Sequence, residues 1–137
     1  MHAGTLGVYL GIERSEFDDL CAKTPGCCLR ERGAGQWEGV PRSSLEAAHP
    51  GALDDAALRP DGFEDARDVV ARMRAAATEL LGHNGVVIAV THGAVLRLLE
   101  KDLTGTGSRF GHLEALVLGP GLVVIGRANF LYSEAQQ

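Results

Sequence analysis

The sequence of 137 residues lacks the features that mark several large classes of protein. It has no long run of basic residues and its net charge is −5, so we expect no nucleic-acid partner. No apolar segment approaches the roughly eighteen residues of a membrane-spanning helix, and no basic-then-apolar leader precedes a cleavage site. We therefore expect a cytoplasmic protein with no membrane partner.

Cysteine is also scarce. Cys21, Cys27 and Cys28 form no Cys-x-x-Cys pair and have no histidine at zinc spacing. We expect reduced thiols with structural or incidental roles, and a redox role is the alternative. The sequence has no His-x-His, His-Glu-x-x-His or carboxylate cluster, and no Gly-x-Gly-x-x-Gly follows a strand, so neither a metal nor another cofactor is expected.

The hydrophobic pattern predicts an α/β protein. Residues 63–82 carry apolar side chains at three- and four-residue steps, which predicts a helix that begins near Asp61 or Gly62 and ends at Gly82. Shorter helices are predicted at residues 3–12, 43–50 and 93–103, and a hairpin at residues 113–127. Together these elements predict one domain over residues 1–137, a three-layer αβα sandwich.

The apolar run "VVIAV", residues 86–90, predicts a strand buried on both faces. His92 follows it, at the edge of the sheet where α/β proteins bind ligands. The first amides of the next helix favour an anion there, and Gly93 leaves them unshielded. A histidine beside that anion can be held protonated or can donate a proton. The alternative is a histidine that only caps the helix and hydrogen-bonds a loop.

Three separated motifs together resemble the histidine phosphatase superfamily, the phosphoglycerate-mutase-like proteins. The stretch "LRERGAGQWEG", residues 29–39, matches the family element Leu-x-Glu-x-x-x-Gly-x-x-x-Gly. "PDG" at residues 60–62 matches the Pro-x-Gly that introduces a helix, and "THG" at residues 91–93 matches the end of the strand that carries the family's second histidine. The resemblance covers residues 3–127 and implies a phosphoglycerate-mutase-like fold.

The resemblance also implies roles for individual residues. Glu31 matches the usual proton donor, a general acid/base, and His92 matches the histidine that stabilises charge on the phosphoryl group. The implied ligand is a small anionic or phosphorylated substrate, and the residues expected to bind it are Arg32, Thr91, Gly93 and His112. Arg30 is expected to be a solvated loop charge, and Trp37 is expected to anchor its loop in the core.

The sequence departs from the family at the N-terminus, because Arg-His-Gly, the nucleophile motif, occurs nowhere in it. It resembles the C-terminal two-thirds of the fold, so we expect a domain that is incomplete at its N-terminus and lacks the ordinary phosphohistidine mechanism. Two alternatives to a phosphatase follow: a repurposed acid/base enzyme (isomerase, lyase or cyclase), and a non-catalytic module that binds an anion or a partner protein. The family's Gly-Glu-Ser reads Gly62-Phe63-Glu64, and we interpret Glu64 as a favourable acid in the first turn of the helix.

The missing N-terminal half also affects the predicted sheet. In the family, its strand lies beside the strand that corresponds to residues 86–90. Without that neighbour, residues 86–90 would form an unpaired apolar edge. We therefore expect a homodimer, or a complex with a separate N-terminal partner chain, that covers this edge.

Overall fold

The structure, a computed structural model, describes residues 29–130. Its helices are α2 (Arg42–Ala48), α3 (Ala66–Leu81) and α4 (Gly93–Thr104), and its strands are β1 (Glu114–Gly119) and β2 (Val123–Asn129). Short 3-10 helices lie at Gly35–Trp37, Ala56–Leu58 and Pro120–Leu122. The helix expected at residues 3–12 and the three cysteines lie outside the described residues.

The predicted long helix is confirmed as α3, but it begins four or five residues later than the expected start at Asp61 or Gly62. Gly62 has a φ of +80° and turns the chain, and Phe63 then forms a β-bridge with Ala34. Asp65 caps the helix instead, since its carboxylate accepts a 2.7 Å hydrogen bond from Arg67 N–H. Glu64 therefore precedes the cap, and its interpretation as an acid in the first helical turn is wrong.

The helices predicted at residues 43–50 and 93–103 are confirmed as α2 and α4. The hairpin is confirmed too, as the antiparallel pair β1–β2 around Pro120–Leu122. The main core lies where α3 and α4 meet one face of this hairpin: Val69 and Met73 come from α3, and Val95 and Leu99 from α4. Leu116 and Leu118 of β1 pack against these side chains, which together make the largest contribution to folding.

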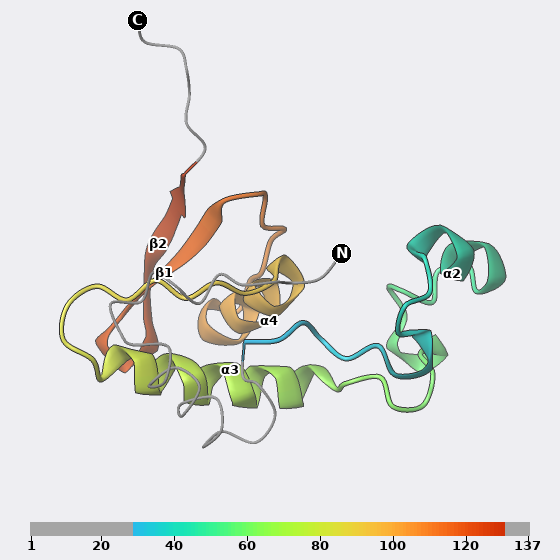
Figure 1. Cartoon of the computed structure of the whole chain (residues 1–137), viewed down its shortest axis with the longest axis horizontal. Coiled ribbons are helices and arrows are strands. Elements are labelled where there is room, and N and C mark those ends of the chain that lie inside the picture. The colour runs from blue at the N-terminus through green and yellow to red at the C-terminus, as the bar shows by residue number, and fades with distance from the viewer. Residues whose placement is uncertain (1–28, 131–137) are drawn as a thin grey trace, which may run out of the picture.

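The α/β class is confirmed, with an arrangement consistent with a partial phosphoglycerate-mutase-like fold. Figure 1 shows α3, α4 and the hairpin gathered at one end and α2 with its neighbouring turns at the other. The outer face of the hairpin carries Val117, Val123 and Ile125, which are 36%, 60% and 69% exposed. In residues 29–130 the sheet is the two-stranded hairpin, and helices cover one of its faces. No helix in this range is both long and apolar enough to cross a membrane.

The prediction of a buried strand at residues 86–90 is wrong. The segment runs without regular secondary structure, and Val86, Ile88 and Val90 are 92%, 53% and 50% exposed. A strand needs a hydrogen-bonded neighbour, and the sheet of the described residues contains β1 and β2 alone. Three apolar side chains of this segment are thus exposed among the described residues.

Candidate functional site

The glycine-rich loop at residues 29–39 is fastened to the turn that precedes α3. Glu64 N–H donates to the carbonyl of Gly33 at 2.9 Å, and Gly33 N–H donates to the Glu64 carboxylate at the same distance. Gly35 has a φ of +58°, and a Cβ atom there would lie 2.5 Å from the backbone carbon of Gly62. The two backbones touch at Gly35 and Gly62, which explains why the loop motif and the "PDG" motif both need glycine.

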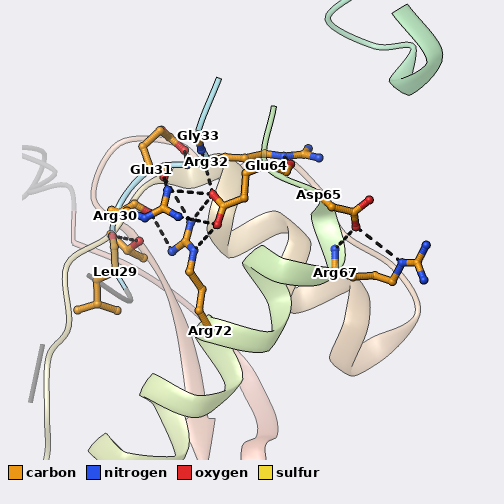
Figure 2. A network of polar contacts seen from close by, with 10 residues as sticks. Leu29, Arg30, Glu31, Arg32, Gly33, Glu64, Asp65, Arg67 and Arg72 are labelled. Atoms are coloured by element: carbon orange, nitrogen blue, oxygen red, sulfur yellow. Dashed lines mark hydrogen bonds and ion pairs between the residues drawn. The ribbon is translucent and has the colours of Figure 1, made fainter. Parts of the chain in front are cut away.

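Behind this loop, Arg72 binds both Glu64 and the loop backbone (Figure 2). Its Nε and Nη2 donate to the two carboxylate oxygens of Glu64 at 2.8 and 3.1 Å. Its Nη1 donates to the carbonyl of Arg30 at 3.0 Å, and Nη2 also donates to the carbonyl of Glu31 at 3.3 Å. The Arg72 side chain is only 8% exposed, so these contacts are screened little by solvent.

Arg30 completes the network from the other side of Glu64. Its two terminal nitrogens donate to the Glu64 carboxylate oxygens at 3.0 and 2.8 Å, although its side chain is 43% exposed. The interpretation of Arg30 as a solvated loop charge is therefore wrong. Bidentate pairing with a buried carboxylate holds the guanidinium in one orientation.

The surroundings of Glu64 favour its charged form strongly. Burial alone would raise its pKa, but hydrogen bonds from Arg72 and Gly33 N–H and the positive charges of Arg72 and Arg30 outweigh burial. The pKa of Glu64 falls to about 2. The carboxylate is thus ionised at any physiological pH and acts as a fixed anchor.

Thr91 fastens the other end of the loop. Its Oγ1 donates to the carbonyl of Leu29 at 2.8 Å, which ties the loop to the segment directly before α4. His92 is the N-cap residue of α4, and its carbonyl accepts the first helical hydrogen bond from Leu96 N–H. The His92 side chain makes no capping hydrogen bond, so the first amides of α4 keep their tendency to attract an anion.

These two attachments bring Glu31 and His92 together. His92 Nδ1 lies 3.2 Å from Glu31 Oε2, and Arg32 N–H donates to Glu31 Oε1 at 3.0 Å. Both side chains of the pair are partly exposed, 37% for His92 and 51% for Glu31. A carboxyl group and an imidazole in this geometry can share a proton and remain open to a ligand.

Arg32 lies on the far side of the same loop. Its Nε donates to the carbonyl of Glu64 at 2.8 Å, and its guanidinium carbon lies 4.9 Å from the centre of the Phe63 ring. Arg59 contacts that ring at the same distance. Burial and the nearby charge of Arg59 lower the pKa of Arg32. Two cations around one ring make this side of the loop electropositive.

The remaining predicted residues have different positions. Gly93 is the first residue of α4, next to His92. His112 is exposed in the turn before β1, and no hydrogen bond links it to Glu31 or His92, so its role in binding stays a prediction. Trp37 is 9% exposed and packs with Leu45 and Ala52, so its predicted anchoring of the loop is confirmed.

The comparison with known proteins agrees with the motifs in this geometry. The family model of the histidine phosphatase superfamily (branch 1) matches residues 25–119. The chain belongs to this superfamily. Over 90 residues it is 33% identical to a glucosyl-3-phosphoglycerate phosphatase of Mycolicibacterium vanbaalenii, and the match covers 56% of this chain and 40% of that protein. The chain thus spans less than half the length of this relative, and no solved structure matches it.

Sequence reasoning within this superfamily pattern missed Arg72 and misinterpreted Glu64. A signal for Arg72 was present: it lies between Val69 and Ala76 on the buried face of α3, next to Met73. An arginine on the apolar stripe of a helix needs a buried acceptor. Glu64, which lies before the helix begins, is that acceptor.

The described residues offer no metal centre. Among residues 29–130, no group of three or more histidine, cysteine, aspartate and glutamate side chains is arranged to hold an ion. The groups that gather at the site are the Glu31–His92 pair, the first amides of α4 and the nearby arginines.

Proposed function

We propose that the protein binds a small phosphomonoester or a similar anion beside His92, with Glu31 as the general acid/base. The contact of 3.2 Å between His92 Nδ1 and Glu31 Oε2 carries this proposal. It joins an imidazole and a carboxyl group at the first turn of α4, where helix amides favour a negative charge. The named relative is a phosphatase, which supports a phosphate ester as the substrate class.

The geometry suggests how the two groups divide the work. Because Nδ1 of His92 faces Glu31, Nε2 is the ring nitrogen available to a ligand. Glu31 in its protonated form donates to Nδ1 of neutral His92, whose Nε2–H donates to a phosphoryl oxygen and stabilises the charge that develops there. As the P–O bond breaks, Glu31 gives its proton to the leaving alcohol oxygen, water adds to phosphorus, and a proton from that water restores Glu31. Thr91 and Gly93 flank His92 in this proposal, whereas the binding roles of Arg32, on the far side of the loop, and of His112 stay predictions.

A second candidate function is anion binding without turnover. It is favoured by one observation, that the sequence contains no Arg-His-Gly motif. Each donor aimed at a transition state contributes roughly 3 kcal/mol of stabilisation, so catalysis by the residues of this sequence without that motif would be weak. Binding needs fewer of these groups than catalysis does.

One experiment separates the two candidates. Turnover of p-nitrophenyl phosphate is measured for the wild-type protein, Glu31→Gln and His92→Ala, and the melting temperature is measured with and without inorganic phosphate. Turnover that falls at least tenfold in both variants supports the phosphatase. No turnover, together with a phosphate-dependent rise in melting temperature that His92→Ala removes, supports the binding module. Neither turnover nor a phosphate effect would overturn both.

We also propose that a second copy of the chain covers residues 86–90. The exposed Val86, Ile88 and Val90 support this, and so does the lack of charge in this stretch, since antiparallel self-pairing would oppose no like charges. Sedimentation velocity at micromolar concentration should give the mass of a dimer, and Ile88→Lys should give a monomer. A wild-type monomer would contradict the homodimer and leave a separate partner chain as the expected cover. The cytoplasmic location stays a prediction.

A further inference from the structure

The Glu31 carboxylate has two contacts, the N–H of Arg32 at Oε1 and Nδ1 of His92 at Oε2. The side chain is 51% exposed, and it lies in a loop segment without regular secondary structure. A half-exposed glutamate on an irregular loop normally samples many rotamers, and ordering it opposes binding. Something beyond the side chain must therefore hold its backbone where the carboxyl group meets His92.

Two arginines hold this backbone, and one of them, Arg30, donates from Nη1 to the carbonyl of Glu31 at 3.3 Å. The carbonyls of Arg30 and Glu31 both accept hydrogen bonds from Arg72, at 3.0 and 3.3 Å. Arg72 is 8% exposed and projects from the regular helix α3, so it is a rigid donor. Its guanidinium plane is fixed on the opposite side by the Glu64 carboxylate, which binds Nε and Nη2.

Only an arginine can make this set of contacts. Its planar fork carries five N–H donors, so it can bind a carboxylate on one edge and carbonyls on another. A lysine at position 72 would keep the positive charge beside Glu64 but would present a single nitrogen. It could not bind the carboxylate with two nitrogens and hold the carbonyls of residues 30 and 31 in place as well.

We infer that Arg72 is a positioning residue for Glu31, and that Glu64 serves by orienting the Arg72 guanidinium. Neither residue contacts the ligand: each acts through the backbone of the loop. The inference rests on the proposed function, because that function assigns the Glu31–His92 pair a role in binding or catalysis. The competing interpretation is a purely structural network that stabilises the fold and leaves the pair unaffected.

The test uses the full chain and four variants. Arg72→Lys breaks the fork but keeps the charge, Glu64→Gln weakens the orientation of Arg72, and Glu31→Gln alters the pair itself. Arg74→Met is the matched control, since Arg74 lies on the same helix and is also ion-paired, to Asp102 at 2.6 Å, outside the site. The first readout is the pair of ring ¹⁵N chemical shifts of His92 by NMR, which needs no catalytic activity.

The NMR outcomes are sharply divided. We expect Arg72→Lys to move the His92 signals in the same direction as Glu31→Gln, Glu64→Gln to move them by less, and Arg74→Met to leave them unchanged. Unchanged His92 signals in a folded Arg72→Lys protein would overturn the inference. If Arg72→Lys does not fold, unchanged signals in Glu64→Gln would overturn it instead. Signals insensitive even to Glu31→Gln would overturn the pair and, with it, both proposals.

The second readout is turnover of p-nitrophenyl phosphate. We expect Arg72→Lys to lower kcat at least tenfold with KM within about twofold, since general acid catalysis contributes roughly 10²–10⁴-fold. The double variant Glu31→Gln/Arg72→Lys should be no slower than Glu31→Gln alone, because Arg72 acts through Glu31. Independent, multiplying losses would overturn the inference. A wild-type protein without turnover counts against the phosphatase, while the NMR outcomes still decide the role of Arg72.

Discussion

Two arginine–glutamate networks of nearly identical chemistry lie in different regions of this molecule. In the first, Arg72 binds both carboxylate oxygens of Glu64 and donates to two loop carbonyls. In the second, Arg127 of β2 binds both carboxylate oxygens of Glu100 on α4 and donates to the carbonyls of Ser108 and Arg109. Each arginine thus joins a carboxylate to a stretch of irregular backbone.

The networks differ in burial and in what they hold. Arg72 is 8% exposed and Arg127 25%, whereas the carboxylates are almost equally covered, at 11% for Glu64 and 12% for Glu100. Arg127 packs over Phe110, with 3.7 Å from its guanidinium carbon to the ring centre, and locks β2 onto α4. Arg72 instead holds the loop that carries Glu31. The same contacts therefore serve the fold in one region and, by our inference, the site in the other.

The largest effect is expected for Arg72→Met. The variant leaves the half-exposed Arg30 as the remaining cation beside Glu64 and removes the hydrogen bond to the carbonyl of Arg30, so the free energy of unfolding should fall by about 3–5 kcal/mol. Urea denaturation followed by circular dichroism measures this. Arg74→Met, which removes an exposed ion pair, should lower it by less than about 1 kcal/mol. Equal losses in the two variants would contradict the distinction drawn from burial.

The second-largest effect is expected from acid, which should weaken the ion pairs of Glu64 and so lower the free energy of unfolding. The pKa of Glu64 is lowered to about 2 in the folded protein from 4.5, so its stabilisation is complete above pH 4.5 and is lost as the pH falls toward 2. The shift corresponds to about 3 kcal/mol at most. Urea unfolding from pH 6 to pH 2 should show this loss, and Glu64→Gln should have a visibly shallower profile. Parallel profiles would show that another carboxyl group dominates. Glu100 is the carboxyl group to compare with Glu64, since the hydrogen bond from Arg127 lowers the pKa of Glu100 as well.

The contrast between the networks also shows how far the sequence predicts this molecule. Helices α3 and α4 and the hairpin follow from local periodicity, capping residues and turn glycines, and all three were predictable. The partners Glu31 and His92 were predictable only through the family motifs, because no local rule brings residues so distant in sequence together. The Arg30–Glu64–Arg72 network was missed because Arg30 and Glu64 look like surface charges in the sequence, although Arg72 stands on the apolar face of α3. The prediction of a strand at residues 86–90 was wrong because a strand needs a hydrogen-bonded neighbouring strand, which residues 29–130 do not provide for it.

A smaller loss is expected for Arg127→Met. It removes the hydrogen bonds to Glu100 and the contact with Phe110, and the free energy of unfolding should fall by about 2 kcal/mol. Because Arg127 does not hold the loop of Glu31, the phosphate-dependent rise in melting temperature should match that of the wild type. If folded Arg127→Met loses the phosphate-dependent rise in melting temperature, the Arg127–Glu100 network serves the site as well as the fold, and our distinction between the two networks is wrong.

The smallest effect is expected for Arg30→Ala, and it tests whether the two arginines around Glu64 are equivalent. Arg30 binds both Glu64 oxygens, as Arg72 does, but it is 43% exposed, so solvent screens the pair and replaces part of the lost interaction. The free energy of unfolding should fall by about 0.5–1 kcal/mol in urea denaturation. Arg30→Ala also removes the 3.3 Å hydrogen bond from Arg30 Nη1 to the carbonyl of Glu31. Arg72 still donates to the carbonyls of residues 30 and 31, so the His92 ring signals should stay near their wild-type positions. If the His92 signals shift as far as they do in Arg72→Lys, then Arg30, Glu64 and Arg72 position Glu31 together, and Arg72 has no special role.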